Sequence, residues 1–157
     1  MRLSYLPILL FLAVSTGLQG RHSVARLWNE AALAAIRADY ARPTVHARNL
    51  FHLAIAMYDA WAVYDDEARP YLLGGDLMSY GCGFDTPADW TENRLSAQRT
   101  SISYAAYRLL SFRFVNSPGA EASQGRFDAL FDSLGYDASY TSLDYSSGDP
   151  AALGNYL

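Results

Sequence analysis

The sequence predicts an all-α protein built as an antiparallel helical bundle. Apolar residues recur at helical spacing in four segments, Pro- and Gly-rich breakers separate these segments, and almost no stretch alternates as a strand does. The chain has 157 residues, with 51% apolar and 18% charged residues, which is typical of one globular domain with a hydrophobic core.

The first 20 residues have the composition of a secretory signal peptide. Arg2 supplies the positive start, Leu3–Val14 is apolar, and the small residues Gly17 and Gly20 follow as cleavage sites. The apolar run is too short to span a membrane comfortably and contains Pro7. We therefore expect a secreted or periplasmic protein with no stable membrane span after cleavage.

The first helix of the mature chain is expected from about Val24 to Tyr40. Ser23 is its expected N-cap, and Pro43 is expected to stop it. The residues expected to face inward are Leu27, Trp28, Ala31, Ala32, Ala35 and Ile36.

The second helix is expected from Thr44, as N-cap, to about Tyr64. Only His52 and Asp59 interrupt the apolar run from Leu50 onward, so this helix is expected to be buried centrally. The short link to the first helix predicts an antiparallel hairpin. One face is formed by Leu50, Leu53, Ala54, Met57, Tyr58 and Trp61.

Residues 65–87 contain several breakers and are expected to form a loop. A third helix is expected from about Trp90 to Phe114, with Asp89 and Glu92 as a capping box. Its apolar seam is Leu95, Ile102, Ala106 and Leu109. Small residues along it, such as Ser101 and Ala105, would permit close helix packing.

A fourth helix is expected from Ala120 to Leu134, with Gly135 as a C-terminal cap. Asp149 followed by Pro150 predicts a further helix start. Because the chain stops within about two turns of that start, we expect residues 21–157 to be the N-terminal helical part of a larger domain, truncated at its C-terminus.

His46, His52 and Asp59 are the strongest candidates for a site. The two histidines lie six residues apart and project about 120° from each other, so one helix cannot direct both to one metal. His52, Asp59 and Arg48 share a line, which allows a ligand site or a set of buried groups bonded to neighbouring elements. We favour the second interpretation because no His-x-x-Glu-His or Glu-x-x-His pattern is present.

The other polar groups carry weaker signals. The acidic run Asp65–Glu67 is interpreted as a solvated helix end, and the lone Cys82 as a small buried or loop thiol. Asp137, Asp144 and Asp149 lack calcium-loop spacing. The net charge of −4, without a basic patch, makes nucleic acid an unexpected partner.

Three segments carry a family resemblance. They are Ala25–Glu30, Ala38–Trp61 and Asp144–Tyr156. The most distinctive is Ala-Arg-Pro-Thr-Val-His-Ala-Arg-Asn-Leu-Phe-His, within the second of them. They resemble the N-terminal region of secreted bacterial proteins similar to vanadium-dependent haloperoxidases, a family grouped with the type-2 phosphatidic-acid phosphatases. The resemblance implies an all-α parent that binds vanadate or phosphate.

The family's binding motifs are Lys-x6-Arg-Pro, Pro-Ser-Gly-His and Ser-Arg-x5-His. All 12 basic residues of this chain are arginines, so the first motif is impossible; seven residues before Arg42 and Arg69 stand Ala35 and Ala62. Ser147–Gly148 is followed by aspartate. No catalytic, cofactor-binding or metal-binding residue is therefore assigned to this chain.

We therefore expect an inactive N-terminal fragment of a secreted haloperoxidase-like protein. Peroxide-dependent halide oxidation, with bound vanadate, would belong to the full-length parent, and its missing C-terminal half would be the partner of this fragment. Two alternatives stay open. The parent could be an acid phosphatase, or the chain could be an exported, non-enzymatic helical module that binds a partner or forms a homo-oligomer.

Overall fold

The computed structural model describes residues 22–77, 80–87 and 89–157 and confirms the all-α fold. The expected signal peptide, residues 1–20, lies outside the described residues. The helices in the described part of the chain are α2 (Val24–Arg37), α3 (Pro43–Ala62), α4 (Arg94–Phe114), α5 (Ala120–Ser133) and α6 (Pro150–Tyr156). Two-residue strands, β1 (Asp76–Leu77) and β2 (Tyr80–Gly81), pair antiparallel in the long loop.

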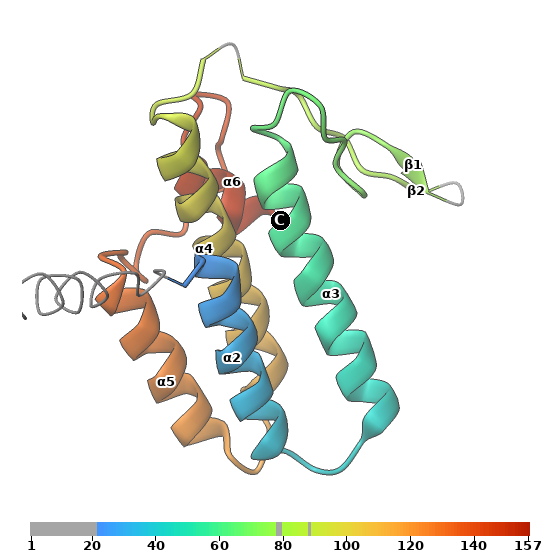
Figure 1. The fold of residues 1–157 in the computed structure, drawn as a ribbon, viewed down its shortest axis with the longest axis vertical. Helices are drawn as coiled ribbons and strands as arrows, with labels where there is room; N and C mark the ends of the chain where they lie inside the picture. Colours follow the sequence, from blue (N-terminus) through green and yellow to red (C-terminus); the bar gives the residue numbers. More distant parts are fainter. Residues whose placement is uncertain (1–21, 78–79, 88) are drawn as a thin grey trace, which may run out of the picture.

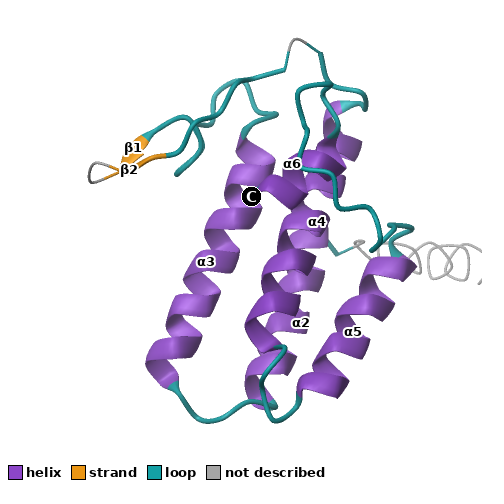
Figure 2. Cartoon of the chain, turned by 180° about the vertical axis from the view of Figure 1, so that it is seen from behind, coloured by secondary structure: helices purple, strands orange, loops and turns teal. Residues whose placement is uncertain are grey.

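Helix α4 is the centre of the bundle. It packs against α2, α3, α5 and α6, and Figures 1 and 2 show α6 crossing beside its N-terminal half. Helices α2 and α3 run antiparallel from the turn at residues 38–42, as expected, but α4 rather than α2 supplies most of the packing surface for α3.

The central burial expected for the second helix is wrong. Its inner side, including Leu53, Met57 and Ala60, is buried, but Leu50, Phe51 and Tyr58 are 36%, 54% and 42% exposed. The reason is geometric: α3 stands at the edge of the bundle and meets α4 along one side only. The loop after α3 covers these outward side chains only in part: the Tyr71 ring lies edge-on to that of Phe51 at 6.4 Å between centroids, and the Tyr58 hydroxyl donates to the Arg69 carbonyl oxygen at 3.1 Å.

Aromatic packing fixes α2 and α5 against α4. Trp28 of α2 is fully buried and lies 6.3 Å, between ring centroids, from Tyr107 of α4. The ring of Phe131, on α5, stacks on that of Tyr107 at 4.3 Å. The inward faces expected for these two helices are confirmed at Trp28, Ala31, Ala32, Ala35, Phe127 and Phe131.

Two predicted helix starts are wrong. The third helix begins at Arg94, not Trp90, and the Asn93 side chain caps it by accepting a hydrogen bond from the Ser96 N–H. Trp90 instead packs on Tyr64, with ring centroids 4.3 Å apart. This tertiary contact holds the chain outside helical geometry.

The second helix begins with Pro43 in its first turn and Arg42 as N-cap, not with Thr44 as N-cap. Proline suits the first helical position because its missing N–H would have no partner there. The first helix ends earlier than expected, at Arg37. The predicted caps Ser23 and Asp149 are confirmed, since each side chain accepts backbone N–H bonds from its helix.

Close packing between α4 and α6 depends on small residues. A Cβ atom added at Gly154 would lie 2.5 Å from the Ser101 carbonyl oxygen and 2.6 Å from the Tyr104 Cβ. The small residues noted along the third helix therefore do permit close approach. Gly135 follows α5 with φ of +83°, as expected of a glycine after a helix.

Candidate functional site

Asp59 is a structural anchor in the described structure. Its fully buried carboxylate accepts backbone N–H bonds from Tyr71, Leu72 and Leu73, at 2.5, 2.8 and 3.1 Å. These bonds tie the loop after α3 back onto the helix and bury Leu73. The preferred interpretation of Asp59, as a buried group bonded to a neighbouring element, agrees with this geometry.

His52 has a different partner from Asp59. Its Nδ1 lies 2.7 Å from Nη2 of Arg113, on α4. Because arginine only donates, the imidazole accepts at Nδ1 and carries its proton on Nε2. Partial burial, followed by the positive charges of Arg113 and Arg48, lowers the pKa of His52 below its ordinary value. The neutral ring is thus the favoured form.

His46 does not join this group. Its Nε2 lies 2.7 Å from the Tyr40 carbonyl oxygen, so Nε2 donates and the bond supports the turn before α3. The two histidines have separate partners, as their spacing predicted.

A small cavity of about 280 Å³ adjoins His52, Asp59 and Arg113. The rest of its lining is apolar: Ile55, Ala56, Leu72, Leu109 and Leu157. We call this cavity, with Arg48 beside His52, the basic pocket. Neither arginine forms an ion pair within the described residues.

Arg113 is the residue that sequence reasoning missed at this place. It lies 61 positions from His52, and only the packing of α4 against α3 brings the two together. A cation inside the last turn of a helix is common and carries no special signal. The absence of any acidic residue within four positions of Arg113 was the available hint.

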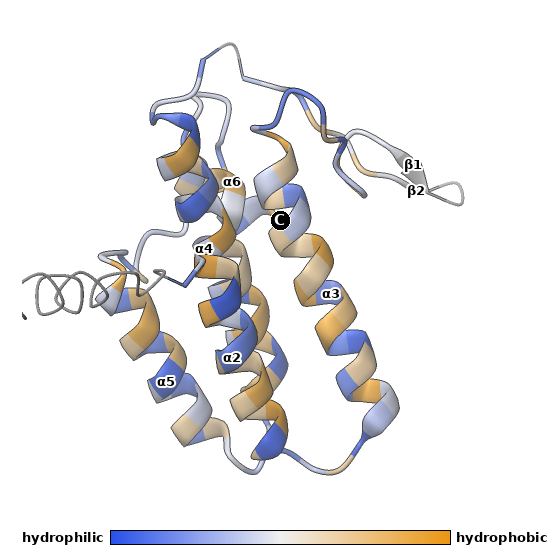
Figure 3. Ribbon diagram, in the orientation of Figure 1, coloured by the Kyte–Doolittle hydropathy of each residue, from blue (hydrophilic) through white to orange (hydrophobic). Residues whose placement is uncertain are grey.

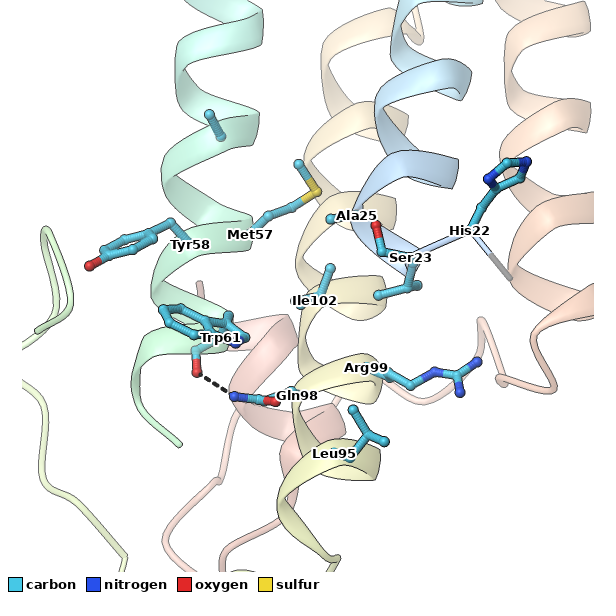
Figure 4. Close-up of a pocket in the computed structure, with 12 residues that line it drawn as sticks. His22, Ser23, Ala25, Met57, Tyr58, Trp61, Leu95, Gln98, Arg99 and Ile102 are labelled. Carbon is cyan, nitrogen blue, oxygen red and sulfur yellow. Dashed lines mark hydrogen bonds between the residues drawn. The ribbon is translucent and has the colours of Figure 1, made fainter. Parts of the chain in front are cut away.

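A larger apolar pocket of about 610 Å³ lies between the start of α2, the second half of α3 and the first half of α4. Figure 4 shows its walls, with Met57 and Trp61 on α3, Ile102 and Leu95 on α4, and Ala25 on α2. The Tyr58 ring also lines the pocket but points away from α4. The Gln98 amide donates to the Trp61 carbonyl oxygen at 3.3 Å at its base. We call this feature the apolar groove. The remaining lining residues are His22, Ser23, Val24, Ala54 and Arg99.

A polar pocket, which shares Leu95 and Arg99 with the apolar groove, is built largely from groups with structural partners. Glu92 accepts hydrogen bonds from the hydroxyls of Ser96 and Thr100. Asp149 caps α6 and accepts from the Tyr140 hydroxyl. These carboxylates stabilise helix ends, which leaves no obvious catalytic pair.

The remaining acidic and thiol candidates also have local roles. Asp65 accepts backbone N–H bonds from Glu67 and Ala68 and pairs with Arg94, and the backbone bonds are the main reason that its pKa is lowered. Asp137 and Asp144 accept from Ser139 and Ser146 in tight turns. Cys82 is a partly buried free thiol in the loop, as expected.

Among the residues the structure describes, no group of three or more His, Cys, Asp or Glu side chains is placed to hold a metal ion. None of the described helices combines the length and hydropathy needed to cross a membrane. In comparisons with known proteins, no family model, curated protein or solved structure matches this chain.

Proposed function

We propose that this chain is the N-terminal helical scaffold of a larger, exported protein related to the vanadium-dependent haloperoxidases. In this proposal the chain contributes packing surface, and residues outside it bind vanadate or phosphate. The three segments that resemble the family and the lack of lysine are the sequence basis.

The observation that carries the proposal is the apolar groove. Met57, Trp61 and Ile102 form walls of a groove that lies between α2 and α3. An unfilled apolar surface of this kind is stabilised when another element excludes water from it. A helix of the parent's remaining part, with its own apolar face, would fit between α2 and α3 and complete the bundle around α4.

The exposed apolar side of α3 supports the same role. Phe51 and Tyr58 lie on the outside of the helix, and a second helical layer would bury them. A solvated surface helix would place charged residues there instead.

The decisive observation is the coding frame downstream of Leu157. The proposal expects Lys-x6-Arg-Pro and Pro-Ser-Gly-His within the following few hundred codons. A stop codon directly after Leu157 would contradict it and favour the self-associating module, for which the exposed Phe51 and Tyr58 are the supporting observation.

Vanadate binding supplies an independent check. We expect the purified 157-residue protein to leave the ⁵¹V NMR signal of orthovanadate unchanged, because no motif of the family's oxyanion site is present. Tight binding would contradict the assignment of that site to the missing part. For the full-length parent, parallel assays of bromide oxidation and phosphate-ester hydrolysis distinguish peroxidase from phosphatase.

A further inference from the structure

The basic pocket has an unbalanced positive charge. Arg113 donates to a neutral histidine rather than to a carboxylate, and Arg48 lies near enough to lower the same histidine's affinity for protons. No acidic side chain pairs with either arginine in the described part of the chain. Asp59, which lines the pocket, already accepts three backbone N–H bonds.

Arg113 also has an unused donor. Its Nε is completely buried and has no hydrogen-bond partner. A guanidinium donates through five N–H groups in a planar fork, and a buried donor without an acceptor costs about 1–3 kcal/mol. An acceptor that reached Arg113 through the pocket would relieve part of this cost.

The apolar lining of the basic pocket restricts which kind of molecule can carry a hydrogen-bond acceptor to Arg113. Ile55, Leu72, Leu109 and Leu157 surround the space beside the charged groups. A phosphate or vanadate ion would place several charged oxygens against these side chains and lose hydration there. A carboxylate matches the arginine fork with two oxygens and leaves the rest of its molecule free to be apolar.

We propose that the basic pocket binds a small monocarboxylic acid with an apolar body, whose carboxylate pairs with Arg113 and whose chain lies among Ile55, Leu72 and Leu109. The cavity of about 280 Å³ corresponds to roughly nine water-sized volumes, taking about 30 Å³ for each. That space suits a hexanoate or a phenylacetate. This site is separate from the apolar groove.

The test is a titration of the 157-residue protein, followed by amide NMR, with hexanoate, hexanol, acetate and inorganic phosphate. We expect hexanoate to shift resonances of residues around the pocket in a saturable way. Hexanol, acetate and phosphate should each bind at least about tenfold more weakly, because each lacks the charge or the chain. Equal affinity for hexanoate and any of these three would overturn the proposal, as would no binding of hexanoate.

Three variants assign the site. Arg113→Gln should weaken hexanoate binding at least about tenfold, because the charge-assisted pair between the guanidinium and the carboxylate is lost. Leu109→Phe keeps the charge and fills the cavity, so it should block binding even if Arg113→Gln were to unfold. Arg37→Gln, on exposed α2 surface, is the matched control and should bind as the unmodified protein does. Unchanged binding by the Leu109→Phe protein would place the ligand elsewhere.

Discussion

At the residue scale, the buried carboxylate of Asp59 fixes the path of the loop that follows α3. Its oxygens accept hydrogen bonds from the backbone N–H groups of three consecutive residues, Tyr71 to Leu73. These N–H groups do not donate within a helix or a regular strand. Buried backbone donors are almost always paired, so a carboxylate at this place replaces a strand partner.

Replacing Asp59 by alanine should lower the free energy of unfolding by about 2–4 kcal/mol, since three backbone donors lose their acceptor. Urea denaturation followed by circular dichroism measures this. The control is Asp66→Ala, which removes a carboxylate whose side chain is 95% exposed and pairs only with Arg94; it should cost less than about 1 kcal/mol. Similar losses for the two variants would show that Asp59 does not anchor the loop.

His52 should make stability depend on pH. Its pKa in the folded protein lies below the ordinary 6.5, so the unfolded chain takes up the proton first as the pH falls. Folding stability should therefore decrease as the pH drops below about 6.5 and stop decreasing once the folded pKa is passed. Burial is the main cause of the lowered pKa of His52, followed by the positive charges of Arg113 on α4 and Arg48 on the same helix as His52.

The measurement compares the free energy of unfolding between pH 7 and pH 5 for the unmodified protein and for His52→Gln. The variant should lose less stability over this range. His22 and His46 are present in both proteins, so their contributions cancel in the difference. An identical pH dependence would mean that His52 has the same proton affinity in both states.

At the element scale, α4 and α6 pack closely because Gly154 faces Ser101 and Tyr104. Gly125 in α5 offers a matched contrast, since nothing lies within 4 Å of a Cβ added there. The two glycines look alike in the sequence, and only their neighbours differ.

Gly154→Ala should destabilise the fold by about 1–3 kcal/mol, because the new methyl group overlaps the α4 backbone. Gly125→Ala should stabilise it by about 0.5–1 kcal/mol through the better helix propensity of alanine. Thermal unfolding of both variants checks these opposite signs. A stabilising Gly154→Ala would show that α6 does not pack against α4 as described.

At the scale of the whole molecule, several large apolar side chains are exposed, and two sets of them involve α3. They line the apolar groove, and they lie on the outer side of α3, where Figure 3 shows hydrophobic residues interleaved with polar ones along the helix. Contiguous exposed apolar surface of this kind favours association.

The 157-residue protein should therefore self-associate as its concentration rises. Sedimentation velocity at several concentrations should show a growing mass, and a Tyr58→Glu, Leu95→Glu double variant should reduce it because both residues line the groove. Leu143→Glu alters a similarly exposed leucine outside the groove and should leave the association unchanged. A protein that stays monomeric throughout would argue against an uncovered surface.

The sequence by itself determined the helices and the inward faces of α2 and α5. It did not determine those of α3 and α4, where the predicted inward residues Leu50, Tyr58 and Leu95 are exposed. Local signals were enough at Ser23, at Asp149 with Pro150 and at Gly135, because a cap depends on only a few neighbouring residues. The periodicity of Trp28, Phe127 and Phe131 was enough to place them in the core. The buried, bonded role of Asp59 also followed from its place among apolar residues.

Only the tertiary structure decided which helix is central and which polar groups meet. The second helix is the more apolar one, yet α4 takes the centre because its small residues let four helices approach it. Trp90 lies outside the helix in which it was expected, where it packs against Tyr64. Arg113 forms a hydrogen bond with His52, although the two residues are 61 positions apart in the sequence. Periodicity reports which side of a helix avoids water, and it does not contain the distances between helices that create a groove or a pocket.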